Sequence, residues 1–145
     1  MSGITDPTEE YFKDGTWGWD GTQWRKIGLL FGYYDRLAGK TVNDNATAGT
    51  NIVDSATVPA GELWVVQLIA GLNLNTAVTS IRLILVAGSI SCGLLDEVPA
   101  AANRWVTWTG EIVLKEGDKI QAAFLGCTAG DDIILIWWGY KVATT

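Results

Sequence analysis

The 145-residue sequence predicts an all-β fold, an antiparallel β-sandwich that is jelly-roll-like. Three observations predict it. From residue 51 onward, apolar residues recur at every second position in short segments. Turn sequences that contain glycine separate these segments, and none of them shows the periodicity and caps of a long helix. We therefore expect an N-terminal arm and Trp-rich β-hairpin region over residues 1–50, and the sandwich domain over residues 51–145.

The chain begins with a polar stretch, MSGITDPTEEYFKDGT, which Pro7 and Gly15 interrupt. This composition is typical of an extended arm. Such an arm is either a disordered tail or a strap that becomes ordered on a partner. Tyr11 and Phe12 favour the strap.

The stretch WGWDGTQW follows the arm and contains Asp20-Gly21, a strong hairpin signal. A two-residue loop would place Trp17 opposite Trp24, whereas a four-residue loop would place Trp19 opposite Trp24. A cross-strand aromatic pair contributes roughly 0.2–1 kcal/mol, too little to hold an isolated hairpin in water. We therefore expect the hairpin to pack against its own sandwich or against a neighbouring subunit.

In the second region, alternation predicts the inward faces of the strands. The segment GELWVVQLIAGLNLN is expected to have one apolar face made of Trp64, Val66, Leu68, Ala70, Leu72 and Leu74. The last segment, DDIILIWWGYKVA, is apolar on both faces, with Ile133, Leu135 and Trp137 on one and Ile134, Ile136 and Trp138 on the other. Such a strand is expected to be buried on both faces, inside one domain or between subunits.

The connections between the strands carry turn chemistry. VPAGE, KEGDK and TAGDD each place a glycine where a positive φ angle is expected, namely Gly61, Gly117 and Gly130.

Composition excludes several classes of function. The net charge is −6 and no run of basic residues occurs, which argues against a nucleic-acid partner. The chain has no histidine, so Ser-His-Asp, Cys-His and histidine-based zinc sites are excluded. Two cysteines cannot form a four-cysteine zinc site. Charged residues make up only 18% of the chain, against about 25% in typical domains, which suggests that much of the surface is covered by copies of the chain.

The carboxylates offer weak candidates for chemistry. Asp131-Asp132, Glu116 and Asp118 lie in turns and are expected to be solvated, turn-forming residues. The stretch Asn43–Asn45 has oxygen ligands but not the spacing of a known calcium loop. We therefore expect no catalytic residue, no metal, no cofactor and no enzyme activity.

Cys92 and Cys127 each lie near the end of an expected strand and could be close in space. A disulfide between them would close a loop of roughly 35 residues, worth about 3–4 kcal/mol in the chain-entropy model. A cytoplasmic site of assembly would keep the thiols reduced, however, which favours free thiols.

Eight tryptophans suggest a second hypothesis, a carbohydrate-binding module, because aromatic rings stack on sugars. Trp17, Trp19 and Trp24 would form its platform. Packing in the core or at a subunit interface explains the other five, which are Trp64, Trp105, Trp108, Trp137 and Trp138.

The first residues lack a basic segment followed by an apolar one, so we expect no secretory signal. The apolar runs IILIWWGY and IGLLFGYY are far shorter than the roughly 20 residues that span a bilayer. We therefore expect assembly in the cytoplasm and no membrane partner.

Several segments resemble small β-sandwich structural proteins of tailed bacteriophages. YFKDGTWGWDGTQWRKI resembles a segment in which a "WDG…W.K" ribbon adjoins a small β-domain. VPAGELWVVQLIAGLN and WTGEIVLKEGDKIQAAFLGCTAGDDIILIWWGYKV resemble the sandwich itself, with a "PAGE" strand opening, an "L.EGD.I.A.F" hairpin and a "GD.I" turn before an aromatic last strand. Together these segments cover most of the chain.

The resemblance implies a virion component, assembled in the host cytoplasm. Its leading form is a capsid decoration (cement) protein that stabilises the head through subunit contacts, as a homotrimer bound to the major capsid protein or other virion proteins. A tail, neck or fibre component is the alternative within this class. The expected interface residues are Tyr11, Phe12, Trp17, Trp19, Trp24, Trp137, Trp138 and Tyr140.

Overall fold

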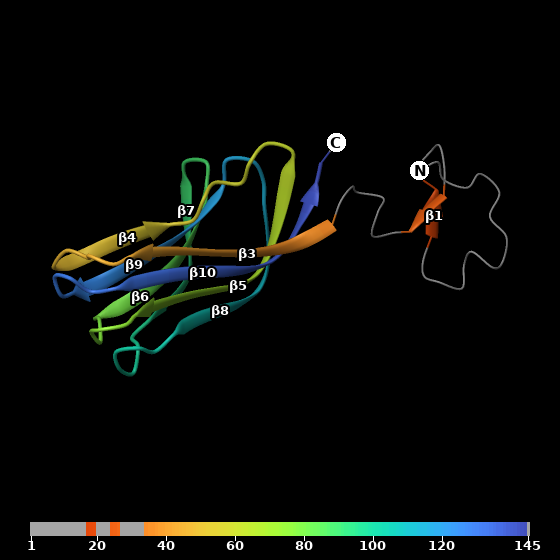
Figure 1. Cartoon of the computed structure of the whole chain (residues 1–145). Coiled ribbons are helices and arrows are strands. Elements are labelled where there is room, and N and C mark those ends of the chain that lie inside the picture. Colours follow the sequence, from red (N-terminus) through yellow and green to blue (C-terminus); the bar gives the residue numbers. More distant parts are fainter. Residues whose placement is uncertain (1–16, 20–23, 27–33, 145) are drawn as a thin grey trace.

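The computed structural model describes residues 17–19, 24–26 and 34–144, which form ten strands (Figure 1). Two short strands, β1 and β2, precede eight longer ones. The strands are β1 (Trp17–Trp19), β2 (Trp24–Lys26), β3 (Tyr34–Asn43), β4 (Gly49–Asp54), β5 (Glu62–Asn73), β6 (Ser80–Ala87), β7 (Ile90–Glu97), β8 (Val106–Leu114), β9 (Lys119–Cys127) and β10 (Ile133–Ala143).

Strands β3 to β10 form two four-stranded sheets packed face to face. The strand order is β3-β10-β5-β8 in one sheet and β4-β9-β6-β7 in the other, and every neighbouring pair is antiparallel. The chain crosses between the sheets at almost every connection, and only β6 and β7 are consecutive strands of one sheet. This order is that of an eight-stranded jelly roll. The all-β antiparallel sandwich predicted from the sequence is confirmed.

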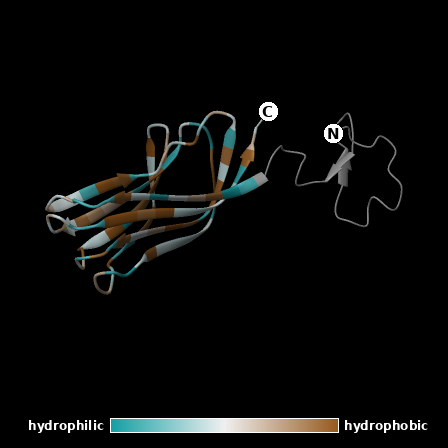
Figure 2. Cartoon of the chain, in the orientation of Figure 1, coloured by the Kyte–Doolittle hydropathy of each residue, from teal (hydrophilic) through white to brown (hydrophobic). Residues whose placement is uncertain are grey.

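The core lies between the two sheets and follows the alternation of the strands. Figure 2 shows hydrophobic residues recurring along the strands of both sheets. In β6 and β9, Ile81, Leu83, Ile120 and Phe124 are fully buried, while Arg82 between two of them is exposed. Because inward residues alternate with outward ones, β6 and β9 each contribute alternate side chains to this shared core.

Strand β5 departs from the predicted alternation. Trp64 and Val66 point into the core as expected, but the next core residue is Ile69, not Leu68. The pairing with β10 explains the change, because Trp138 lies opposite Leu68 and the following residue, Gly139, lies opposite Val66. Gln67 is therefore an extra residue in β5, a β-bulge. It turns Leu68, Ala70 and Leu72 to the outside, so the predicted single apolar face was wrong beyond residue 66.

The sandwich begins before residue 51. Strand β3 pairs with β10 along its whole length, and β4 pairs with β9. The boundary predicted after residue 50 therefore falls inside the sandwich, within β4. Strand β3 escaped the sequence analysis because it is an edge strand in which Leu37 is the only buried large apolar residue among residues 35–43, whose side chains the structure describes.

Three predicted turns have the expected backbone geometry, and the structure shows one of the two alternatives for the hairpin loop. Gly61, Gly117 and Gly130 all have positive φ angles, of 80°, 87° and 89°, as predicted. In the ribbon formed by β1 and β2, Trp19 lies opposite Trp24. The four-residue loop is therefore the correct alternative. The predicted strap residues Tyr11 and Phe12 lie outside the described residues.

Candidate interaction surface

The outward side of the β3-β10-β5-β8 sheet carries the candidate site, and we call it the outer face. Residues directly opposite each other in an antiparallel pair share a face. The register therefore places three strands' outward residues together: Arg36, Ala38, Lys40 and Val42 from β3; Ile134, Ile136, Trp138 and Tyr140 from β10; and Leu68, Ala70 and Leu72 from β5. Most of these are apolar, so β10 is apolar on both faces, as its sequence predicts.

Part of this face is exposed. Trp138 and Val42 each expose 47% of their surface, and Val113 on β8 exposes 61%. By contrast, Ala70 and Leu72 in the middle of the sheet expose 2% and 3%. Trp138 lies directly opposite Leu68 and two residues from Ile136, both half-buried, and an exposed apolar cluster of this kind indicates an interaction surface.

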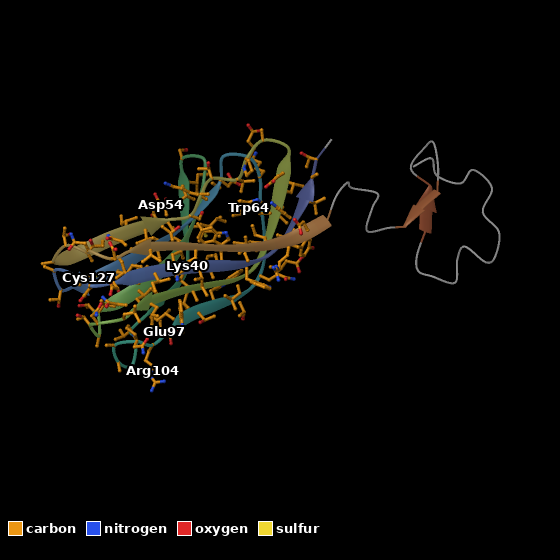
Figure 3. All side chains as sticks on the ribbon, in the orientation of Figure 1. Lys40, Asp54, Trp64, Glu97, Arg104 and Cys127 are labelled. Atoms are coloured by element: carbon orange, nitrogen blue, oxygen red, sulfur yellow. The ribbon has the colours of Figure 1, made fainter. Side chains whose placement is uncertain are left out.

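A shallow groove runs over β3 and β10 on this face. It has a volume of about 660 Å³. Its lining is almost wholly apolar, with Lys40 as the one charged residue: Ala38, Gly39, Lys40, Leu68, Ile136, Trp137 and Trp138. Figure 3 shows Lys40 on β3. An apolar groove with a cation at its border can receive an apolar side chain that has an acidic neighbour.

Arg36 lies beside the groove, over the exposed Trp138. Its guanidinium carbon is 5.4 Å from the centre of the indole ring. At an exposed site such a cation–π contact is worth about 0.5–1 kcal/mol. Arg36 therefore covers part of the indole and fixes its orientation.

Trp137 points to the other side of the sheet and belongs to the core. It exposes 6% of its surface, and its ring stacks on Trp64 with centroids 6.5 Å apart and planes inclined by 17°. Its indole nitrogen is buried and has no hydrogen-bond partner among the described residues. Of the predicted interface residues on β10, Trp137 is thus a core residue, Trp138 is exposed and Tyr140 is half-buried on the outer face.

Trp17, Trp19 and Trp24 belong to the ribbon, whose backbone pairing is described. Trp64 is buried in the core, and Trp108 is partly buried against it. Trp105, just before β8, exposes 47% of its surface.

The turn carboxylates are not all solvated, which corrects the sequence analysis. Asp131 exposes only 3% and accepts hydrogen bonds from Asn73 Nδ2 at 2.8 Å, the Thr128 amide at 2.8 Å and Thr76 Oγ1 at 2.9 Å. Burial raises the pKa of Asp131, but these three hydrogen bonds outweigh it and the net pKa is lowered. Asp131 therefore joins its own loop, between β9 and β10, to the end of β5 and the loop that follows it, at one end of the sandwich.

Asp118 is also buried, with 6% exposed, and accepts a hydrogen bond from the Lys115 amide at 3.0 Å. It closes the turn between β8 and β9. Glu116 is exposed and Asp132 is half-exposed, as the sequence analysis expected.

The two cysteines are free thiols and lie far apart. Cys92 is exposed on β7, opposite Leu85, which in turn lies opposite Ile120 on β9. Cys127 is seven residues further along β9 than Ile120. At the rise of a β-strand, this separates the two positions by roughly 23 Å. The expected proximity was therefore wrong. Figure 3 places Cys127 at the end of the sandwich away from Trp64. Burial raises the pKa of Cys127, so this thiol is unsuited to act as a nucleophile.

Among the described residues, no group of three or more acidic or cysteine side chains could hold a metal ion. In the same part of the chain, no helix is long and apolar enough to cross a membrane.

Sequence reasoning missed half of the groove. It identified β10 as apolar on both faces, but not Ala38, Lys40 or Leu68. Ala38 and Lys40 lie on β3, a strand with little alternation, and Leu68 faces outward because of the bulge at Gln67. Neither has a reliable pattern in a single sequence.

No protein-family model matches the chain, and no curated protein matches it. A search of solved structures finds distant likenesses, of which two are given. One, described as "CBM4 structure and function", is 13% identical over 74% of this chain and 92% of that chain, with a TM-score of 0.32. The other, described as "Bacillus endospore appendages form a novel family of disulfide-linked pili", is 11% identical over 79% of this chain and 94% of that chain, with a TM-score of 0.35. These likenesses are too distant to bear on function.

Proposed function

We propose that this chain is a non-enzymatic structural subunit that assembles by packing its outer face against protein. One observation carries the proposal: β10 is apolar on both sides, with Trp137 and Leu135 in the core and Trp138 and Ile136 facing outward beside an apolar groove. Burying apolar surface is the main driving force of association. Tryptophan and arginine, both present here, are enriched where interfaces are tightest.

The groove suits protein better than carbohydrate. A sugar site needs several hydrogen-bonding groups beside its aromatic ring. The groove has Lys40 as its one charged lining residue, and Arg36 already lies over the ring of Trp138. The glycan hypothesis of the sequence analysis named Trp17, Trp19 and Trp24, whose side chains are outside the described part of the chain.

In its specific form, the proposal is a decoration protein of a bacteriophage head, a homotrimer on the assembled shell. This form rests on the sequence resemblance, and a tail, neck or fibre component is the alternative. A decoration protein binds the assembled shell and not its separate subunits, which stabilises the shell by mass action.

The test is the mass of the full chain in solution, by light scattering at several concentrations. We expect a stable oligomer, with a trimer at about 47 kDa, three times the 15.6 kDa chain. Trp138→Glu should reduce it to the single chain because a charge would be buried in the interface. The matched control is Ile52→Glu, which places the same charge at an apolar residue of the other sheet that is 59% exposed.

Two results would count against the proposal. One is an oligomer that Ile52→Glu disrupts and Trp138→Glu does not. The other is a single chain at all concentrations that binds saturably to members of a glycan array, which would favour the carbohydrate-binding alternative.

A further inference from the structure

We infer that the groove on the outer face is filled by the ribbon, residues 17–26, of a second copy of this chain. This inference rests on the proposed function, because it names the protein that packs against the outer face. It joins an exposed apolar groove and a very short ribbon.

The ribbon needs a surface to pack against. Each of its strands has only three residues, β1 (Trp17–Trp19) and β2 (Trp24–Lys26). A two-stranded hairpin is at best marginally stable in water. The register places Trp19 opposite Trp24, and position 17 is two residues from position 19. All three tryptophan positions therefore fall on the same face of the ribbon.

The groove offers a matching surface. Trp138, Ile136 and Leu68 give it an apolar floor of about the breadth of two strands. A tryptophan buries about 150–250 Å² when it packs. Three of them would therefore bury roughly 450–750 Å², which approaches one partner's share of a standard interface, about 800 Å².

The distance along the chain favours a neighbouring copy over the chain's own ribbon. Seven residues, 27–33, join the ribbon to the start of β3 at Tyr34. The groove is centred near Gly39, five residues along β3, or roughly 17 Å away. A reversal of the chain uses two to five residues, which leaves two to five residues to span at most roughly 7–18 Å. A contact with the chain's own groove would require the linker to reverse and return along β3, whereas a neighbour's ribbon has no such constraint.

The contact would join two different surfaces, so it would be heterologous. Repeated from copy to copy, such a contact closes into a ring or continues as an open fibre.

Because the contact joins two different surfaces, it can be tested by complementation between two full-length variants. The groove variant is Trp138→Glu. The ribbon variant carries Trp17→Ser, Trp19→Ser and Trp24→Ser together, and circular dichroism checks that both are folded.

We expect each variant alone to be a single chain of 15.6 kDa. Mixed, they should form a one-to-one heterodimer of about 31 kDa, because one supplies an intact groove and the other an intact ribbon. Loss of such a cluster should weaken self-association roughly 30-fold or more. Native mass spectrometry and sedimentation measure the masses.

Other results overturn the inference and separate it from the proposed function. A ribbon variant that still oligomerises would show that the outer face pairs with something other than the ribbon, and the proposed function would stand. Two folded variants that stay single chains when mixed would exclude the ribbon-to-groove contact between copies. If the unaltered chain is itself a single chain, both the inference and self-assembly through the outer face fail.

Discussion

The indole of Trp137 occupies the space where a side chain of Gly39 would be. A β-carbon built on Gly39 would lie 2.0 Å from Cε2 and 2.4 Å from Nε1 of that indole. Gly39 and Trp137 are directly opposite each other on β3 and β10. The glycine thus lets the tryptophan lie flat across the neighbouring strand and stack on Trp64.

Gly39→Ala should therefore destabilise the sandwich. The methyl group would force the Trp137 ring out of its stack, and overpacking of this kind costs about 1–3 kcal/mol. The control is Gly93→Ala on β7, where an added β-carbon would meet nothing within 4 Å. Urea unfolding should show a lower midpoint for Gly39→Ala alone, with an unchanged slope. Equal midpoints would mean that Trp137 moves freely.

Asp131 should make the stability of the protein depend on acid pH. Its pKa is lowered in the folded state, so its contribution is complete above the unfolded value, about pH 4, and is lost as the pH falls through the folded value. Asp131→Asn should cost about 1–3 kcal/mol at pH 7 and should flatten the loss of stability below pH 4. Asp132→Asn, which makes the same change in charge next to it, is the control. The measurement is urea unfolding from pH 7 to pH 2.5.

The two thiols should react at very different rates. Cys92 is exposed, whereas Cys127 is buried and burial raises its pKa. A thiol reagent should modify one cysteine in the folded protein and two in denaturant. Cys92→Ser should abolish the fast reaction. Rapid modification of both thiols in the folded chain would contradict the burial of Cys127.

Arg36 and Trp138 should be energetically coupled on the outer face. Because the guanidinium lies 5.4 Å from the ring centre, a double-mutant cycle of Arg36→Gln and Trp138→Leu should give a coupling of about 0.5–1 kcal/mol. The unfolding free energies of the four proteins measure it. The contact is exposed, so additive losses would mean that it contributes nothing to the folded state.

The sequence predicted the sandwich well where the strands alternate regularly. The inward faces of β6, β9 and β10 follow the period of two, and the positive φ angles at Gly61, Gly117 and Gly130 follow from turn chemistry. These signals are local, so a single sequence contains them.

The features that the sequence did not predict depend on pairing between strands that are distant in the chain. The bulge at Gln67 can be identified only from the pairing of β5 with β10, about 70 residues later in the chain. This bulge determines which residues of β5 face outward. Edge strand β3 has little alternation of its own because most of its described residues are polar or small, and Leu37 is the one large apolar side chain among them that is buried. Half of the groove comes from these two strands. Sequence reasoning therefore found the apolar side of β10 but not the surface around it.

The place of β10 in its sheet also governs the order of folding. It follows the other seven strands of the sandwich along the chain, yet it lies between β3 and β5 and is the only sheet neighbour of β3 in the described part of the chain. Pairing of Tyr34 with Val142 closes a loop of more than one hundred residues, an entropically demanding step. Until β10 has been synthesised, β3 lacks this neighbour and the β3-β10-β5-β8 sheet is split in two. We therefore expect the sandwich to fold only once β10 is available, slowly, and to be most prone to aggregation before then.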